Sequence, residues 1–156
     1  MGISWPLWMW NGTRMYKEPG CILLDTHVWL WLTTGVSKTV SPRLRSLIEK
    51  LAPEKKVLIS AISVWEIGVL VAKKRISFEC GVREWVFRNL NISGIEVETL
   101  SPEAAIESTL LPEGMHGDPA DRMLLATAIN IGATLITHDK EVLAYSKKHK
   151  FPALYL

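Results

Sequence analysis

Apolar residues along the chain form two kinds of pattern. Short runs such as CILLD, KVLIS and ATLIT have the length of strands buried on both faces, and GIEVETL alternates like a strand. Longer segments repeat their apolar residues every three or four positions, as helices do. The pattern predicts strands at 21–25, 56–60, 94–100 and 133–137, with a possible fifth at 152–156.

The helical segments begin and end with recognisable signals. Ser41 and Pro42 suit the N-cap and the first helical position, and Gly132 follows the apolar segment that ends at Ile131. Helices are predicted at 26–32, 41–52, 61–76, 82–92, 101–111, 119–131 and 140–148. Strands that alternate with helices indicate an α/β fold, in which a central parallel sheet of four or five strands has helices on both faces.

The composition is that of one globular domain. The chain has 156 residues, of which 48% are hydrophobic and 22% are charged. Because the predicted elements start at residue 21, the domain is assigned to 21–156 and residues 1–20 to an N-terminal extension of unknown role. The extension lacks the basic start and long apolar core of a signal peptide, and Met15 within it is an alternative initiator.

Charge and cysteine content narrow the class of protein only a little. A net charge of +2 permits nucleic-acid binding without arguing for it. Cys21 and Cys80 are too few for a disulfide scaffold and lack metal-ligand spacing, so a cytoplasmic location is expected. No apolar run approaches the roughly 18–20 residues of a membrane span.

Two aspartates follow predicted strands. Asp25 ends the run CILLD, and Asp139 comes two residues after ATLIT. In an open parallel sheet the binding crevice lies beyond the carboxyl ends of the strands, so both side chains are expected to face it. A turn or helix-cap role explains either residue equally well by itself.

Glu66 is the only charged residue of its predicted helix before Lys73. Its neighbours in AISVWEIGVLVA are mostly apolar, and a carboxylate among apolar side chains is costly unless it is paired or bound to a metal. The alternatives are a buried ion pair or a narrow polar strip with Ser63 and Gly68. The pattern favours a functional role for Glu66.

The motif DPADR contains two aspartates that helix geometry separates. Asp118 fits the N-cap and Pro119 the first helical position, so local helix physics explains Asp118. Asp121 lies one turn inside, where Leu124 and Leu125 follow at i+3 and i+4 and place it on the core-facing side. Capping explains Asp121 only in part, so this residue needs a further partner.

The sequence therefore predicts that four carboxylates converge: Asp25, Glu66, Asp121 and Asp139. Without a cation they would repel one another and raise each other's pKa. A hard divalent ion such as Mg²⁺ removes this repulsion, because it binds carboxylate oxygens together with waters and phosphate. Such an ion activates water and stabilises charge on a phosphodiester.

Four segments resemble the acidic motifs of PIN-domain ribonucleases. They stand in the family's order, over about residues 21–156, and read LLDTHVWLW, ISAISVWEIGVL, DPADRMLLATA and GATLITHD. The forms Asp-Pro-x-Asp-Arg and Trp-Glu-Ile favour the VapC-type toxins of bacterial and archaeal toxin–antitoxin pairs.

The resemblance implies an α/β/α sandwich and a Mg²⁺- or Mn²⁺-dependent endoribonuclease. It assigns catalysis and metal binding to Asp25, Glu66, Asp121 and Asp139, with Asp25 and Asp121 as the foremost direct ligands. By analogy, a metal-bound water attacks the phosphate in line and leaves a 5′-phosphate and a 3′-hydroxyl. The implied partners are an RNA substrate, a small VapB-type antitoxin and a second copy of the chain.

Several further residues stand beside the acidic set. Thr26 and Thr137 are candidates to orient a carboxylate, a water or a phosphate. Possible supporting residues by position are Asp118, Arg122, His27 and His138. For a lone arginine or histidine, a salt bridge or a structural role is the more ordinary explanation. Core packing is expected for most of Trp29, Trp31, Trp65 and Trp85, and one or two of them are candidates to line an antitoxin groove.

Two other functions stay open. A metal-dependent DNA nuclease would use the same carboxylates, but such enzymes typically carry long insertions that this compact chain lacks. A non-catalytic PIN module that binds RNA or a protein would be expected to have lost acidic residues, and all four are present. Their retention favours an enzyme without proving turnover.

Overall fold

The computed structural model of this chain describes residues 19–35, 40–92, 94–115 and 117–155. Most of the N-terminal extension predicted at 1–20, including Met15 and its tryptophans, lies outside these residues. The last residue of the possible strand at 152–156 also lies outside them.

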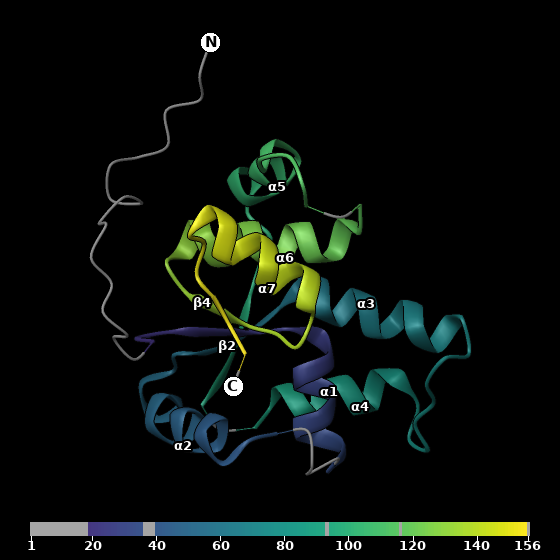
Figure 1. Cartoon of the computed structure of the whole chain (residues 1–156). Helices are drawn as coiled ribbons and strands as arrows, with labels where there is room; N and C mark the ends of the chain where they lie inside the picture. Colours follow the sequence, from purple (N-terminus) through teal and green to yellow (C-terminus); the bar gives the residue numbers. More distant parts are fainter. Residues whose placement is uncertain (1–18, 36–39, 93, 116, 156) are drawn as a thin grey trace.

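Five parallel strands form one sheet within the described residues (Figure 1). They are β1 (Ile22–Leu24), β2 (Val57–Ser60), β3 (Ile95–Glu98), β4 (Thr134–Ile136) and β5 (Ala153–Leu154). Their order across the sheet is β3-β2-β1-β4-β5, and every neighbouring pair is parallel. The prediction of a central parallel sheet of four or five strands is confirmed with five, since the possible last strand is the short β5.

Helices follow the strands in the predicted order. They are α1 (Thr26–Thr34), α2 (Pro42–Leu51), the short 3-10 turn η3 (Ala52–Glu54), α3 (Ala61–Ala72), α4 (Val82–Leu90), α5 (Pro102–Leu110), α6 (Pro119–Ile131) and α7 (Lys140–His149). The hydroxyls of Ser41 and Ser101 each accept an N–H bond of 3.1 Å inside the helix that they precede. Gly132 closes α6 at a φ of 69°, where glycine is favoured over other residues.

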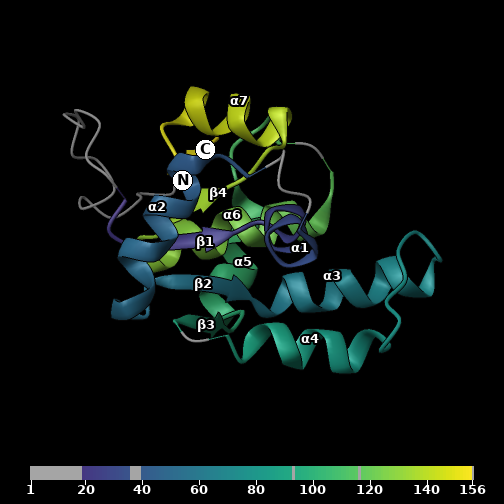
Figure 2. The same cartoon turned by 90° about the horizontal axis from the view of Figure 1, so that it is seen from below.

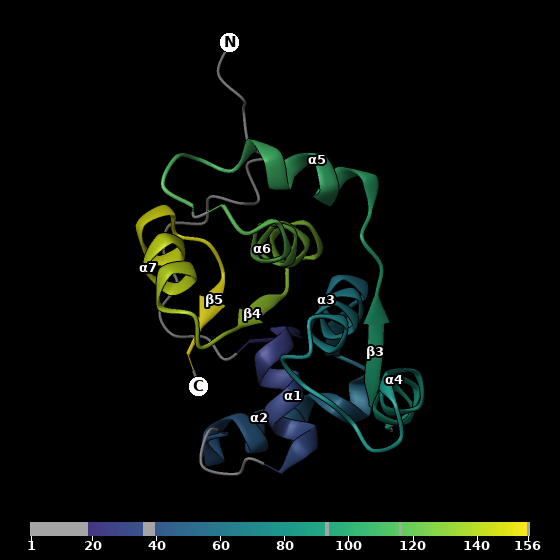
Figure 3. The same cartoon turned by 90° about the vertical axis from the view of Figure 1, so that its right-hand side faces the viewer.

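Alternate residues of β1 enter two separate apolar layers, so both faces of the sheet are covered. Ile22 and Leu24 pack with α1, α2 and α4 on one face, whereas Leu23 packs with α6 and α7 on the other. Helix α5 lies on the outer side of α6 (Figure 3). This three-layer arrangement is the predicted α/β fold.

Helices α3 and α4 run side by side beyond the ends of the strands (Figure 2). In α3 only Ser63 and Ile67 are buried, although the helix is apolar almost all round. Core packing was the prediction for most tryptophans, and it holds for Trp29 and Trp85 but not for Trp65, which is 55% exposed. Helix α3 projects past the sheet, and the described residues leave Trp65 uncovered there.

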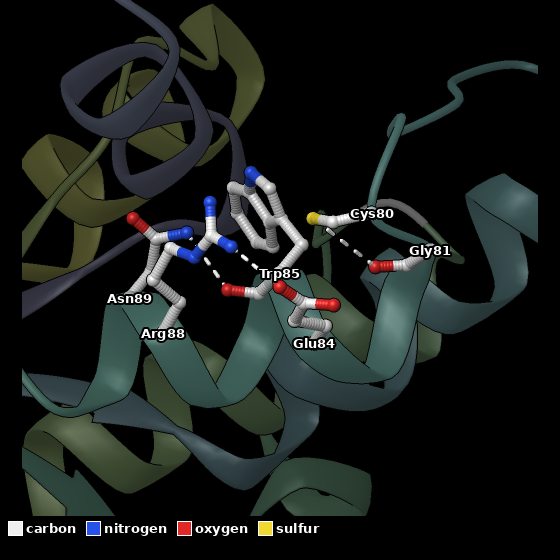
Figure 4. A network of polar contacts seen from close by, with 6 residues as sticks. All are labelled: Cys80, Gly81, Glu84, Trp85, Arg88 and Asn89. Carbon is white, nitrogen blue, oxygen red and sulfur yellow. Dashed lines mark hydrogen bonds and ion pairs between the residues drawn. The ribbon is translucent and has the colours of Figure 1, made fainter.

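Residues on α4 and just before it form a network of polar contacts (Figure 4). Arg88 pairs with Glu84 at 2.5 Å, and the side-chain amide of Asn89 donates to the Trp85 carbonyl at 2.8 Å. The Trp85 ring stacks on Phe78 at 4.3 Å between centroids. The ring contact packs α4 against Phe78, and the two polar contacts link successive turns of α4, so we assign all three a structural role.

Cys21 and Cys80 are free thiols. No helix in the described residues is both long enough and apolar enough to cross a membrane.

Candidate active site

The acidic residues lie at the carboxyl edge of the sheet, where the ends of β2, β1 and β4 are neighbours. Asp25 directly follows β1, and its backbone N–H donates to the Ile136 carbonyl at the end of β4. Asp139 follows β4, and Glu66 lies on α3, which begins directly after β2. Asp121 reaches this edge from the first turn of α6. The parallel order of the strands thus brings together side chains that are far apart in the sequence.

Asp25 is buried, with 5% of its surface exposed, and a threonine holds its carboxylate. Thr137 donates its hydroxyl hydrogen to Asp25 Oδ2 at 2.5 Å. The same hydroxyl oxygen accepts the Asp139 backbone N–H at 3.0 Å. Because Thr137 is itself buried, it fixes the positions of the residues that follow β1 and β4 relative to each other.

Glu66 is held by a second threonine. Buried Thr26, the first residue of α1, donates its hydroxyl hydrogen to Glu66 Oε2 at 2.5 Å. Burial raises the pKa of Glu66 above its usual value, and the charges of Asp25 and Asp118 raise it further. The hydrogen bond from Thr26 and the nearby His27 act in the opposite direction. Thr26 thus stabilises the ionised form of a carboxylate that its surroundings disfavour.

The two aspartates of DPADR take different positions, as helix geometry predicts. Asp118 is exposed, and its Oδ1 accepts the Ala120 N–H at 2.8 Å as the N-cap of α6. Asp121 is half-buried, and its pKa is raised from 3.8 to about 7. Burial is the largest cause, followed by the charges of Asp25, Asp118, Asp139 and Glu66. The charges of the neighbouring carboxylates thus add to the effect of burial at Asp121.

Asp139 also caps a helix. Its Oδ1 accepts the N–H groups of Glu141 and Val142 at 2.7 and 3.0 Å, at the start of α7. This geometry matches the cap role that the sequence left open. The charge of Asp139 still acts on Asp121, so capping does not remove this residue from the acidic cluster.

Arg122 points toward a neighbouring helix. Its Nε donates to the Ser108 carbonyl in α5 at 2.9 Å. This bond joins α6 to α5 and matches the structural alternative for Arg122. Farther along α6, the hydroxyl of Thr127 donates to the Met123 carbonyl of the same helix at 2.7 Å.

The side chains at this edge fit a hard divalent cation in their donor chemistry. They offer carboxylate and hydroxyl oxygens, which Mg²⁺ and Mn²⁺ prefer over softer ligands. The raised pKa of Asp121 shows that a further negative charge is unfavourable there unless a positive charge balances it. Within the described residues, however, no three Asp, Glu, His or Cys side chains stand close enough together to form a ready-made set of ligands. The convergence of four carboxylates on one ion stays a prediction.

One feature at this edge was missed from the sequence. His138 follows β4, and its ring contacts both Trp31 on α1 and Tyr155 after β5. His27 and Trp31 are four residues apart on α1 and their rings are neighbours, but nothing local indicated the partners of His138. These contacts depend on the adjacency of β1, β4 and β5.

Comparison with known sequences gives a family and a relative. The sequence model of the PIN domain matches residues 22–148. A curated relative, ribonuclease VapC22 of Mycobacterium tuberculosis, is 29% identical over 133 residues, which are 84% of this chain and 93% of the relative.

Solved structures of similar fold come from several bacteria. VapBC2 from Rickettsia felis, bound to a DNA fragment from its promoter, has a TM-score of 0.65 at 16% identity and covers 86% of this chain and 98% of its own. FitAcB from Neisseria gonorrhoeae has a TM-score of 0.58 at 20% identity and covers 85% and 96%. At these identities the likeness shows the fold alone.

Proposed function

This chain belongs to the PIN-domain family, and from that premise we propose that it is a Mg²⁺- or Mn²⁺-dependent endoribonuclease, the toxin of a VapBC-type toxin–antitoxin pair. The observation that carries the proposal is the acidic cluster at the carboxyl edge of the sheet, where burial and then the charges of four neighbouring carboxylates raise the pKa of Asp121. The similarity to a ribonuclease relative supports RNA as the substrate class.

Asp25 and Asp121 are the residues that we propose as direct metal ligands, with Glu66 and Asp139 completing the acidic set. A bound Mg²⁺ or Mn²⁺ would supply an activated water and would balance charge on the phosphodiester. In the absence of such an ion, Asp121 holds a proton up to nearly neutral pH. Its carboxylate form is the one that binds a cation, so proton release from Asp121 accompanies occupation of the site.

The two buried threonines act as positioning residues. Thr137 holds Asp25 Oδ2 and thereby leaves the orientation of that carboxylate fixed before substrate arrives. Thr26 does the same for Glu66. A carboxylate whose orientation is already set loses less freedom when it binds a cation or a water.

The central experiment compares wild type with Asp25→Asn and Asp121→Asn on labelled single-stranded RNA, with Mg²⁺, with Mn²⁺ and with EDTA. We expect metal-dependent cleavage by wild type and its loss in both variants. Glu103→Gln, an exposed acid on α5, is the matched control and should cleave as wild type does. Cleavage that survives both substitutions, or that persists in EDTA, would refute the metal mechanism.

The same assay separates the alternative functions. A single-stranded DNA of matching sequence tests the DNA nuclease, which would cleave DNA in preference to RNA. Binding of RNA without cleavage under every metal condition would identify a non-catalytic module.

The toxin assignment is tested in cells. Expression of the wild-type chain should arrest growth, and expression of Asp121→Asn should not. Co-expression of a short VapB-type protein encoded by the neighbouring gene should restore growth. The proposed homodimer is measured by light scattering of the purified chain.

A further inference from the structure

Four aromatic rings form a continuous row beside the acidic residues. His27 and Trp31 lie one turn apart on α1, with ring centroids 6.1 Å apart. The rings of Trp31 and His138 meet edge to face with centroids 4.9 Å apart, and the centroids of His138 and Tyr155 are 4.4 Å apart. We call these four residues the aromatic row. It crosses from α1 to the ends of β4 and β5, three elements that are distant in the sequence.

The two ends of the aromatic row are open to solvent, whereas its middle is packed. His27 is exposed, and the Tyr155 side chain is 64% exposed. Trp31 and His138 are half-buried between them. The Nε2 atom of His138 is buried and has no hydrogen-bond partner among the described residues, although buried polar atoms normally have one. The inner rings therefore support two outer rings whose surfaces remain available.

The aromatic row starts at the acidic residues. The His27 backbone N–H faces the Asp25 carboxylate, and the charge of His27 acts on Glu66. His138 stands in the sequence between Thr137, which holds Asp25, and Asp139, which caps α7. A substrate whose phosphate lies at the carboxylates would thus meet the aromatic row with the groups next to that phosphate.

We propose that the aromatic row stacks unpaired bases of the RNA strand beside the scissile phosphate, with Tyr155 as the principal stacking position. The proposal rests on the proposed function, because an acidic site that cleaves RNA would bring the bases next to the cleaved phosphodiester onto the neighbouring aromatic surface. Every base has a π-face that stacks on an aromatic ring, independently of base identity. Such stacking supplies affinity without further charge, next to a cluster that repels phosphate.

The proposal also specifies the form of the substrate. Bases inside a duplex are stacked on one another and are not free to lie on a side chain, whereas those in loops and single strands are. Tyr155 should therefore contribute to the binding of single-stranded RNA but not of duplex RNA.

The test measures binding in an Asp121→Asn background, so that the RNA is not consumed. Fluorescence anisotropy of a labelled single-stranded oligoribonucleotide gives the Kd. Adding Tyr155→Ala should raise the Kd about 5- to 150-fold, the range of one base stacked on one aromatic ring. Tyr155→Phe, which keeps the ring, should stay within about twofold of the background, since the stacked face is unchanged. Phe87→Ala removes a 55% exposed ring on α4, away from the aromatic row, and should have no effect.

Two further probes exclude other roles of Tyr155. An abasic oligonucleotide of the same length should bind equally to the background and to Tyr155→Ala, because it offers nothing to stack. Thermal unfolding of Tyr155→Ala should match that of the background, since the side chain is largely exposed.

Three results would overturn the aromatic row as a base-stacking surface. The first is an unchanged Kd for Tyr155→Ala. The second is an equal loss of affinity of this variant for single-stranded, abasic and duplex RNA. The third is a loss of antitoxin binding by this variant while its RNA binding stays intact. The last would make the surface a protein-docking site. If wild type cleaves RNA but Tyr155→Ala leaves the Kd unchanged, the stacking proposal fails and the nuclease proposal stands. A Tyr155-dependent Kd without cleavage by wild type removes the nuclease assignment alone.

Discussion

The hydroxyl of Thr137 joins two acidic residues. It donates to the carboxylate of Asp25 and accepts from the backbone of Asp139, so one side chain uses both its donor and an acceptor lone pair. Thr137 is 1% exposed, and water therefore does not replace these bonds when the hydroxyl is removed. Removal of Thr137 should consequently affect both stability and the orientation of Asp25.

Thr137→Val replaces the hydroxyl with a methyl group of nearly the same size. We expect the free energy of unfolding to fall by about 1–3 kcal/mol, because a buried carboxylate oxygen and a buried N–H lose their partner. Cleavage should fall as well. Thr127→Val is the matched control, since Thr127 is equally buried but its hydroxyl donates to a carbonyl of its own helix. Urea unfolding of both variants gives the comparison, and equal losses would contradict a special role of Thr137.

Asp121 predicts a pH dependence of stability in the metal-free protein. Its carboxyl group has an ordinary pKa of 3.8 and a folded pKa of about 7, so between these values the unfolded chain binds fewer protons than the folded one. The contribution of Asp121 to the free energy of unfolding is therefore present at low pH, declines from about pH 4 to about pH 7, and is constant above that. Asp121→Asn should abolish this decline.

Urea midpoints of wild type and Asp121→Asn, measured in EDTA from pH 4 to pH 8, test this expectation. From about pH 4 to about pH 7, the urea midpoint of wild type should fall relative to that of Asp121→Asn. Parallel curves would show that Asp121 ionises normally. Since the change is read from unfolding, it is independent of nuclease activity.

At the level of elements, α6 is the helix that presents an acidic residue to the strand ends. Asp118 begins it as the N-cap, Pro119 occupies its first position, and Gly132 ends it. The same arrangement of cap and proline begins α5 at Ser101 and Pro102, where neither residue belongs to the acidic set. Both helices therefore begin in the same way, but only α6 of the two carries a residue of the acidic set in its first turn.

Asp118→Ala and Ser101→Ala should each lower the free energy of unfolding by about 0.5–2 kcal/mol, the usual range for a lost N-cap. Asp118→Ala should also keep some nuclease activity, whereas Asp121→Asn should keep the fold and lose activity. Parallel measurements of urea unfolding and RNA cleavage on the three variants decide the matter. An inactive but stable Asp118→Ala, or an active Asp121→Asn, would reverse the assignment of the two aspartates.

For the whole molecule, the order of the sheet concentrates negative charge at one edge. Asp25, Glu66, Asp121 and Asp139 come from four different segments, and folding brings their charges close enough to act on Asp121. The folded chain therefore bears an electrostatic penalty that the unfolded chain lacks. A divalent cation that binds only the folded form should relieve it.

Mg²⁺ or Mn²⁺ should consequently raise the Tm of wild type at pH 8, and less so at pH 5, where protons compete for the carboxylates. Asp121→Asn should show a much smaller rise. NaCl at equal ionic strength is the control for general screening. Differential scanning fluorimetry measures all arms, and an identical Mg²⁺ effect on wild type and Asp121→Asn would exclude Asp121 as a ligand.

Several features of the fold were predictable because they depend on near neighbours in the chain. The caps at Ser41, Ser60 and Asp118 involve bonds across two or three residues, so local sequence specifies them. Exposure was harder to predict. Trp65 has a buried-looking sequence environment, yet it is exposed because α3 extends beyond the sheet.

By itself the sequence determined which residues carry charge at strand and helix ends, and it separated Asp118 from Asp121, because capping and helical spacing are local. Only the tertiary structure decided which of those ends are neighbours. Thr137 lies 112 positions from Asp25, and the two meet because β4 pairs with β1. The raised pKa of Asp121 and the contacts of the aromatic row have the same origin, since burial, charge and ring contacts depend on distance in space rather than along the chain.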